Sequence, residues 1–317
     1  MVVSIYHPNF WFKHGHWGYE HQLCHSNKRA AFSFEVNTVR PATDIVVIHD
    51  DLDSALKIKA RAGCFILVTG EEQSIRAQYH PEYLNQFDLV ITSRRDIIHP
   101  NIVHTHYLHP YRIRKECHEL ISLADIRKYK PVSAIVSNLT ILPGHKARYA
   151  FINKMKGHYK DTLDWFGNGE DAYLADKWDG LAPYEYSIAI ENSQHENYFT
   201  EKITDCFLSF TMPFYWGCPN LNTFFDERSF VTLDLKDFIT SIARIDECLA
   251  AGTRMQNLKF IKDSRRLVLE KYAFVPALVD ILSAQVISKT TQRKTIRPQS
   301  YFAQGIVKRF ASKMLGK

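Results

Sequence analysis

Short, mainly β-branched apolar runs alternate with longer mixed stretches in the first half of the chain. Runs of this length predict strands rather than helices, and they cover residues 2–6, 44–49, 64–69 and 88–93. Their hydrophobicity is continuous rather than alternating, so we expect strands covered on both faces, as in a parallel sheet flanked by helices. Between them, residues 51–63 predict an amphipathic helix that ends at Gly63.

A second series of the same kind begins after the charged stretch 125–131. It predicts helices over 145–158 and near 200–210, and strands at 132–137, 162–167, 186–190, 212–216 and 229–234. Two successive series predict two doubly wound α/β domains that face each other across a cleft. We expect an N-terminal domain over residues 1–128, a C-terminal domain over 129–290 and a tail over 291–317. Ligands of such sheets bind outside the carboxyl ends of the strands, so functional residues should directly follow strands.

Composition narrows the classes of function. The 317 residues are 45% hydrophobic, which is enough for packed cores, and their formal charge is +6. This mild excess favours anionic partners such as phosphates or a membrane surface and is too weak to imply nucleic acid. Cys64 and Cys206 lie in apolar runs, as expected for buried thiols in a reducing compartment. The chain lacks a signal-peptide pattern and a run of about 18–20 apolar residues, so we expect the body of the protein to be soluble.

The tail differs in composition from the rest of the chain. Phe302, Ile306, Phe310 and Met314 recur every four residues among lysines and arginines. One interpretation is a basic amphipathic helix in peripheral contact with an anionic membrane. The other is a terminal helix that packs back on the body and keeps its lysines in solvent.

The segment 184–219 places polar residues between two apolar runs. Asn192 comes just after a predicted strand, and Thr200 is suited to capping the next helix. Glu201 and Lys202 then fall in the first helical turn, where free N–H groups and the positive end of the helix dipole favour a phosphate. Lys202 adds a positive charge, and Glu201 can accept hydrogen bonds from ribose hydroxyls. Taken alone, this turn is more simply explained as a capped helix with a surface Glu and Lys.

The whole string from Ile190 to Pro219 resembles the signature of glycosyltransferase family 10, the α-1,3/α-1,4-fucosyltransferases, in their bacterial form. The family pattern is F-E-N-S, a short spacer, Y-[VI]-T-E-K and then P-[VI]-Y-W-G. The chain matches it at Glu191, Asn192, Ser193, Tyr198, Thr200, Glu201, Lys202, Pro213, Tyr215, Trp216 and Gly217. Ile190 stands for the usual Phe and Phe199 for Val or Ile, both apolar exchanges. The resemblance implies the GT-B fold, with two facing Rossmann-like domains, and inverting transfer of L-fucose from GDP-β-L-fucose to a glycan hydroxyl.

The resemblance also implies a donor site. Residues 136–151 are similar to the family's strand-loop-helix, which presents an arginine to the donor pyrophosphate. The implied donor-binding residues are Asn138, Arg148, Asn192, Tyr198, Glu201 and Lys202. Arg148 and Lys202 would contact the pyrophosphate, and Asn192, Tyr198 and Glu201 the nucleotide and sugar. For Arg148 the alternative is a solvated helix face.

On the acceptor side, residues 65–74 resemble the family's T-G-E-N segment, whose glutamate is the general base. That role falls on Glu71, although Glu72 stands where the family has Asn, which leaves open which carboxylate acts. A carboxylate that takes the acceptor's proton accelerates transfer by about 10²–10⁴-fold. Fixed cations would stabilise the leaving diphosphate, so no metal cofactor is implied. The alternative for two glutamates after a strand is a helix start with favourable dipole charges.

Other readings compete with this one. Asp51-Leu52-Asp53 has the D-x-D form of metal-dependent glycosyltransferases, but this string precedes a predicted helix and we favour a role in capping it. His104, His106 and His109 lack the further ligands of a zinc site. The resemblance to the bacterial members implies action in the cytoplasm on an oligosaccharide or lipid-linked acceptor of a surface glycan such as lipopolysaccharide. Transfer of another GDP-linked deoxy or amino sugar, or a non-catalytic glycan- or nucleotide-binding role, stays open.

Overall fold

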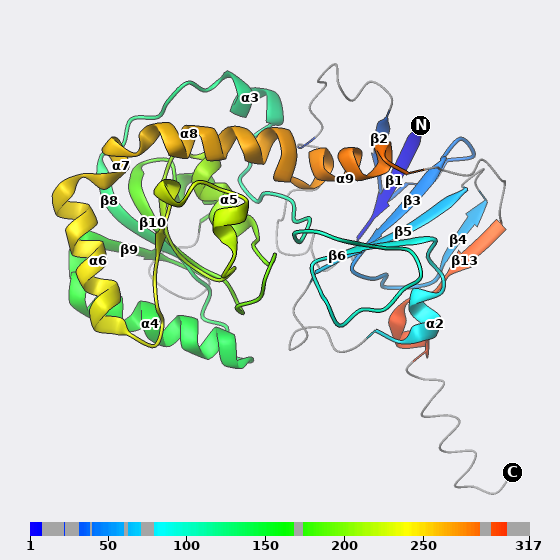
Figure 1. The fold of residues 1–317 in the computed structure, drawn as a ribbon, viewed down its shortest axis with the longest axis horizontal. Coiled ribbons are helices and arrows are strands. Elements are labelled where there is room, and N and C mark those ends of the chain that lie inside the picture. The colour runs from blue at the N-terminus through cyan, green and yellow to red at the C-terminus, as the bar shows by residue number, and fades with distance from the viewer. Residues whose placement is uncertain are drawn as a thin grey trace, which may run out of the picture. The chain divides into compact units, whose positions relative to one another are not determined.

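The computed structural model describes residues 1–7, 22, 32–38, 40–59, 63–70, 79–167, 174–285 and 293–302. The chain divides into two compact units, each built on a parallel sheet (Figure 1). Unit 1 comprises Met1–Leu108 and Val279–Lys317, and unit 2 comprises His109–Leu278. We describe each unit by itself.

Unit 1 contains a sheet with the strand order β2-β1-β3-β5-β6-β7, in which all neighbouring strands are parallel. The strands are β1 (Val2–Tyr6), β2 (Ser33–Val36), β3 (Ile45–His49), β5 (Cys64–Thr69), β6 (Leu89–Thr92) and β7 (Ile102–His104). All five residues of β3 are buried, as its continuous apolar run predicts for a strand in the middle of a parallel sheet. The four strands predicted in this half are confirmed as β1, β3, β5 and β6. The short helix α2 (Pro81–Leu84) lies between β5 and β6.

The predicted helix over residues 51–63 is wrong. The chain forms β4 (Leu56–Lys59) there, which pairs antiparallel with β13 (Arg293–Ile296). The sequence LKIK alternates with a period of two, which fits a strand, but its partner lies more than 200 residues along the chain and leaves no local trace. Asp51 therefore caps no helix; its carboxylate accepts the backbone N–H groups of Leu52 and Gln299 at 2.8 and 3.1 Å.

The start of the tail returns to unit 1. After β13, Phe302 packs against an apolar cluster of this unit, with its ring 5.7 Å from His80 and 6.5 Å from Tyr83. Residues 293–302 thus follow the interpretation of a segment that packs back on the body. Ile306, Phe310 and Met314 lie outside the described residues, and the membrane contact of the tail stays a prediction.

Unit 2 contains a sheet with the strand order β12-β11-β10-β8-β9, again with parallel neighbours. Its strands are β8 (Lys130–Ile135), β9 (Leu163–Phe166), β10 (Tyr184–Ile190), β11 (Met212–Trp216) and β12 (Val231–Thr232), which confirm the five strands predicted here. The helices are α3 (Cys117–Ser122), α4 (Pro143–Tyr159), α5 (Glu201–Leu208), α6 (Phe238–Ala251), α7 (Thr253–Gln256), α8 (Leu258–Leu267) and α9 (Phe274–Ser283), the last of which runs across the boundary between the units. The helices predicted at 145–158 and near 200–210 are α4 and α5.

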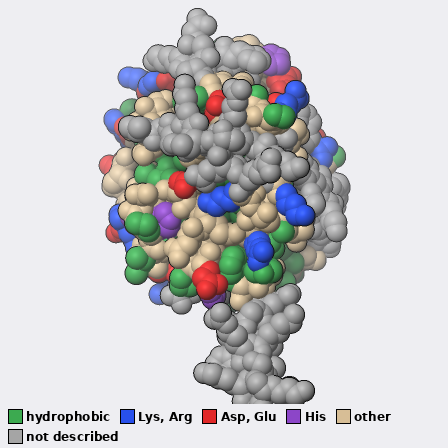
Figure 2. All heavy atoms as spheres, turned by 90° about the vertical axis from the view of Figure 1, so that its right-hand side faces the viewer, with side chains coloured by type: hydrophobic (Ala, Val, Ile, Leu, Met, Phe, Trp, Pro, Cys, Tyr) green, Lys and Arg blue, Asp and Glu red, His purple; other side chains and the backbone are tan. Residues whose placement is uncertain are grey.

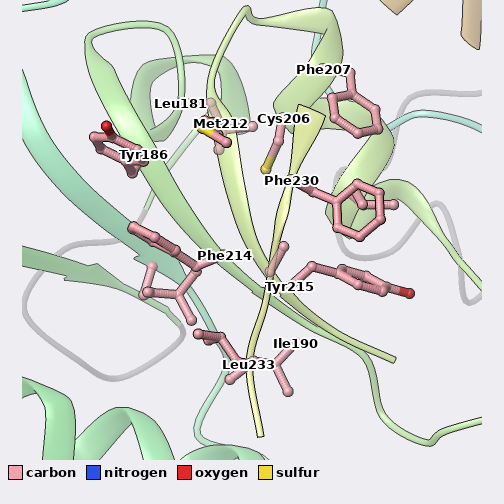
Figure 3. Packing of buried hydrophobic residues seen from close by; sticks show 14 of the residues in the cluster. Leu181, Tyr186, Ile190, Cys206, Phe207, Met212, Phe214, Tyr215, Phe230 and Leu233 are labelled. Atoms are coloured by element: carbon pink, nitrogen blue, oxygen red, sulfur yellow. The ribbon is translucent and has the colours of Figure 1, made fainter. Parts of the chain in front are cut away.

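The core of unit 2 lies between its sheet and the helices (Figure 3). Tyr186 of β10 stacks on Phe214 of β11, with ring centroids 5.0 Å apart. Helix α5 buries Cys206 and Phe207 in the same cluster. Burying a large apolar side chain contributes about 1.5–3 kcal/mol, so this packing fixes α5 against the ends of β10 and β11.

The C-terminal end of α5 is held by two arginines and by Lys128, whose pKa is lowered by burial to about 6. Arg265 Nε donates to the carbonyl of Leu208 at 3.1 Å, Arg254 Nε to that of Phe210 at 2.9 Å, and Lys128 Nζ to that of Ser209 at 2.6 Å. Cations near a helix C-terminus complement its partial negative charge. The far end of α5 is therefore fixed, and with it the position of the first turn.

The units divide the chain elsewhere than the predicted boundaries after residues 128 and 290. Residues 109–128 belong to unit 2, because Tyr111, Ile113 and Leu120 are part of its core. The chain from Val279 onward groups with unit 1, where β13 pairs with β4. The charged stretch 125–131 is a change in composition but not the boundary between the units.

The cysteines and the surface were compared with the expectations from composition. Cys64 and Cys206 are free thiols, whereas Cys117 is disulfide-bonded. Burial raises the pKa of Cys64 to about 11 and that of Cys206 to about 12, so both stay protonated near neutral pH. No helix of the described residues has the length and apolarity to cross a membrane. On the face in Figure 2, basic side chains lie scattered among acidic and apolar ones.

Candidate functional site

A buried carboxylate faces the start of α5. Glu191 directly follows β10 and is fully buried. Its Oε1 accepts the backbone N–H of Thr200 at 2.8 Å, and Thr200 Oγ1 lies 2.8 Å from its Oε2. Lys202 Nζ lies 3.0 Å from the same Oε2. Thr200 caps α5 as predicted, because its Oγ1 accepts the N–H of Lys202 at 3.4 Å. The charge of Lys202 and the positive end of the helix are thus balanced within the chain.

The glycine of the W-G pair makes room for this carboxylate. Gly217 follows β11, and a Cβ there would lie 2.4 Å from Glu191 Cγ and 2.5 Å from the hydroxyl of Tyr215. Neither neighbour is free to move, because Glu191 is fully buried and the Tyr215 hydroxyl accepts the N–H of Cys218 at 2.9 Å. Residues from both halves of the sequence signature therefore meet at one point of the sheet edge.

Glu201 is held by basic side chains on both of its oxygens. Oε1 lies 3.0 Å from Lys177 Nζ, and Oε2 lies 3.3 Å from His109 Nδ1. Burial alone would raise the pKa of Glu201, but the charges of Lys177, Lys202 and His109 hold it well below its usual range. Glu201 is therefore an ionised carboxylate in a fixed orientation, able to accept hydrogen bonds from hydroxyl groups.

Asp205 lies one turn later on the same face of α5 and is almost fully buried. Its carboxylate accepts the N–H of Arg112 at 3.0 Å and lies 3.5 Å from Lys177 Nζ. Burial raises the pKa of Asp205 to about 7; Lys177 opposes this shift and Glu201 adds to it. The group consequently titrates near neutral pH. A pocket lies here, lined by Ile135, Lys177, Leu181, Ser187, Ile188, Ala189, Ile190, Glu201, Lys202 and Asp205.

Arg148 reaches from α4 to the residues that follow β10. Its Nη1 donates to Asn192 Oδ1 at 2.5 Å and its Nη2 to Ser137 Oγ at 3.3 Å. The side chain is only 6% exposed, so a solvated position for Arg148 is wrong. Burial lowers the pKa of the guanidinium, while Glu191 and Glu201 oppose that shift. An arginine remains protonated in proteins, so a buried cation lies beside Asn192.

The start of α4 lies against the same residues. A Cβ at Gly144 would fall 1.7 Å from the carbonyl oxygen of Asn192, so only glycine permits this approach. Leu142, at the N-cap position of α4, makes no side-chain cap. Within the described residues, three buried polar atoms here have no hydrogen-bond partner: His145 Nδ1, Arg148 Nε and Ser193 Oγ.

The predicted donor residues have different positions. The structure brings Arg148, Asn192, Glu201 and Lys202 to the carboxyl ends of β8 and β10. Tyr198 is only 2% exposed, and Asn138 lies exposed in the loop after β8. The donor contacts predicted for all six residues stay predictions.

The predicted base, Glu71, lies outside the described residues, as does Glu72. Gly70, just before it, packs on the ring of Tyr107, whose hydroxyl donates to the buried Asp50 carboxylate at 3.0 Å. Asp50 also accepts the hydroxyl of Thr69 at 3.0 Å. In unit 1, polar groups thus gather at the carboxyl ends of β3 and β5, where the base was predicted.

For metals, the described residues hold no group of three or more His, Cys, Asp and Glu side chains placed to bind an ion. His109, one of the three clustered histidines, lies against Glu201 instead.

Sequence reasoning missed several of these residues. Glu191 was only a matched position, although an acidic residue directly after an apolar strand is a usable signal. The spacing of four between Glu201 and Asp205 places both on one helix face and could have identified Asp205. Lys177 left no signal, because it meets Glu201 only through the fold.

The sequence is similar to known proteins in the region that contains this site. Residues 126–254 match the family model "Glycosyltransferase family 10 (fucosyltransferase) C-term". The chain is 40% identical over 106 residues to an α-(1,3)-fucosyltransferase of Helicobacter pylori. This alignment covers 32% of the chain and 21% of the relative, so the matched part spans about a fifth of that protein's length.

The similarity to solved structures extends over more of the chain. An α1,3-fucosyltransferase crystallised with GDP-fucose is 18% identical with a TM-score of 0.50, over 86% of this chain and 93% of that one. A glycosyltransferase from Rickettsia africae is 10% identical with a TM-score of 0.51, over 89% and 97% of the two chains. These similarities confirm the fold class, two Rossmann-like α/β units of the GT-B type.

Proposed function

We propose that the protein, whose residues 126–254 belong to the C-terminal domain of glycosyltransferase family 10, transfers L-fucose from GDP-β-L-fucose to a glycan hydroxyl with inversion. One observation carries the proposal: Arg148, Asn192, Glu201 and Lys202 meet at the carboxyl ends of neighbouring parallel strands. Nucleotides bind at this edge in doubly wound sheets. Unit 2 is accordingly the proposed GDP-sugar unit.

On the donor side, the departing diphosphate gains negative charge as the bond to the anomeric carbon breaks. Arg148 and Lys202 offer fixed positive charges that stabilise this change without reorganisation. Glu201, ionised and held at both oxygens, accepts hydrogen bonds from ribose or sugar hydroxyls. Asn192 is oriented by Arg148 and presents its amide N–H groups to the same ligand. Asn138 and Tyr198 complete the proposed donor contacts.

On the acceptor side, Glu71 is the proposed base. The acceptor oxygen forms a bond to the anomeric carbon while the diphosphate leaves from the opposite face, and Glu71 takes the hydroxyl proton. Such proton transfer contributes about 10²–10⁴-fold to the rate. The cations present make a metal cofactor unnecessary in this mechanism. We further propose an oligosaccharide or lipid-linked acceptor of a bacterial surface glycan, reached in the cytoplasm at the inner membrane face.

The proposal is tested by calorimetry with GDP, UDP and CMP, followed by turnover with several GDP-sugars. We expect GDP to bind tightest and GDP-fucose to turn over fastest. Preference for UDP would contradict the proposal, and faster turnover of another GDP-sugar would replace fucose. Binding of GDP without any transfer would indicate a non-catalytic nucleotide-binding protein.

The assignment of the base has its own test. Glu71→Gln should lower turnover by at least about 100-fold and leave GDP affinity nearly unchanged, because the variant keeps its shape and loses only its basicity. Glu72→Gln is the matched control and should keep most of the activity. The reverse pattern would assign the base to Glu72, and two active variants would place it elsewhere.

A further inference from the structure

His145 is the third residue of α4, a helix of 17 residues. Its Nδ1 is buried and has no hydrogen-bond partner within the described residues. Buried polar side-chain atoms are nearly always hydrogen-bonded, so an unpaired one requires an explanation. Nothing in the proposed transfer mechanism has used this residue so far.

The surroundings of His145 have the features of an anion site. The first N–H groups of a helix have no partner within the helix and carry its positive dipole end, and no side chain caps α4. Arg148 lies three residues later on the same face, and helical side chains lean toward the helix N-terminus. Its guanidinium is 6% exposed and keeps Nε unpaired, and the nearby Ser193 Oγ is unpaired as well.

These groups form one cluster rather than separate defects. Arg148 binds Asn192 Oδ1, and the backbone carbonyl of Asn192 touches Gly144 in the first turn of α4. The unpaired Arg148 Nε can only donate a hydrogen bond, and the Ser193 hydroxyl also offers a proton. A ligand rich in acceptor oxygens would satisfy all of them together.

The charges around His145 decide its protonation state. Burial lowers the pKa of His145, and the positive charges of Arg148 on α4 and of Lys202 on α5 lower it further. Lys202 is itself paired with Glu191. In the free protein the imidazole is consequently neutral at neutral pH. A bound diphosphate would offset both cations and favour the imidazolium.

We propose that His145 is a further donor-site residue, which takes up a proton from solvent when a nucleoside diphosphate binds and then donates a hydrogen bond to it. The inference rests on the proposed function, and it adds that His145 recognises the negative charge of the diphosphate. The imidazolium is a third cation, beside Arg148 and Lys202, for the charge that grows on the leaving diphosphate.

The test is titration calorimetry of GDP into the full chain near pH 7.5, in buffers that differ in ionisation enthalpy. For the wild type, the binding heat should vary with the buffer and correspond to uptake of up to about one proton. His145→Gln should abolish this dependence and weaken GDP binding about tenfold or more, as expected for loss of a hydrogen bond to a charged group. GMP, which carries less charge, should drive less uptake in the wild type.

Two control variants separate His145 from other groups. His158→Gln changes an exposed histidine at the opposite end of α4 and should keep both proton uptake and affinity. Asp205→Asn removes a second group, whose pKa is raised to about 7, and should keep the uptake due to His145. Uptake that persists in His145→Gln, or disappears in Asp205→Asn, overturns the inference. A wild type that binds GDP without buffer-dependent heat also overturns it, whereas a wild type that binds no GDP overturns the proposed function.

Discussion

The starts of α4 and α5 differ in how their positive ends are satisfied. Both helices follow strands that are neighbours in the sheet of unit 2, β8 and β10. The start of α5 is capped by Thr200 and faced by the buried Glu191, which also pairs with Lys202. The start of α4 has no side-chain cap, and His145 Nδ1 and Arg148 Nε beside it have no partner within the described residues.

The difference indicates that the two helix starts have different roles in ligand binding. At α5 the buried carboxylate of Glu191 orients Lys202, and residues 109 and 177 orient Glu201. Both side chains are therefore positioned before any ligand arrives, which lowers the entropic cost of binding. At α4 hydrogen-bonding capacity is left over for a ligand. We therefore propose that the diphosphate, which was predicted to bind at the first turn of α5, lies between the two helix starts, where α4 offers the unpaired polar atoms.

The largest expected effect is on folding. Glu191→Ala would leave Lys202 and the N–H of Thr200 without their buried acceptor. Removing one partner of a buried ion pair costs about 3–5 kcal/mol, which denaturant unfolding would measure. Glu270→Ala is the control, because its exposed carboxylate pairs with Arg266 at 3.2 Å and should cost less than about 1 kcal/mol. Equal losses of unfolding free energy in the two variants would show that the start of α5 does not need the carboxylate of Glu191 for its stability.

The next effect compares the two helix starts directly through GDP affinity. Lys202→Ala should weaken GDP binding by about 1.5–3 kcal/mol, the range for a hydrogen bond to a charged group. Arg148→Ala should cost more, because a guanidinium can form two such bonds at once. Arg228→Ala, which changes an exposed arginine paired with Asp226, should leave affinity unchanged. A larger loss for Lys202 than for Arg148 would return the diphosphate to the α5 start.

The smallest effect is a pH dependence behind the α5 start. Because the pKa of Asp205 is raised to about 7 in the folded state, the native protein binds this proton more tightly than the unfolded chain does. The contribution of Asp205 to stability is therefore full below about pH 4 and is lost as the pH rises through 7. Glu201 has a lowered pKa and acts in the opposite direction, but below its usual range.

Unfolding free energies at pH 5 and pH 7, measured for the wild type and for Asp205→Asn, would isolate this term. The wild type should lose about 2 kcal/mol more than the variant over this interval. The comparison with the variant cancels the contribution of His145, which has the opposite sign because its pKa is lowered. Equal losses would mean that Asp205 is ionised throughout.

Some parts of the site could be predicted from the sequence and others could not. The local sequence was enough to predict the cap at Thr200 and the turn that contains Glu201 and Lys202. It was also enough to predict the buried strand before them. The roles of Glu191 and Lys177 could not be predicted, because each depends on a contact with a residue that is distant in sequence. Glu201 illustrates the limit: its place in the first turn of α5 was predicted correctly, but its two basic partners are residues 109 and 177, which are distant in sequence.

The sequence by itself determined the order of strands and helices, because the spacing of apolar residues within a few positions sets which faces are buried. It also determined the resemblance of residues 190–219 to a family signature, because the signature residues are close together in the chain. Only the tertiary structure decided that residues 56–59 form a strand with residues 293–296 and that Glu191 neutralises Lys202. It alone left His145 and Arg148 with unpaired atoms. These outcomes depend on contacts between distant residues, and their free energies arise only when packing excludes water around the charges.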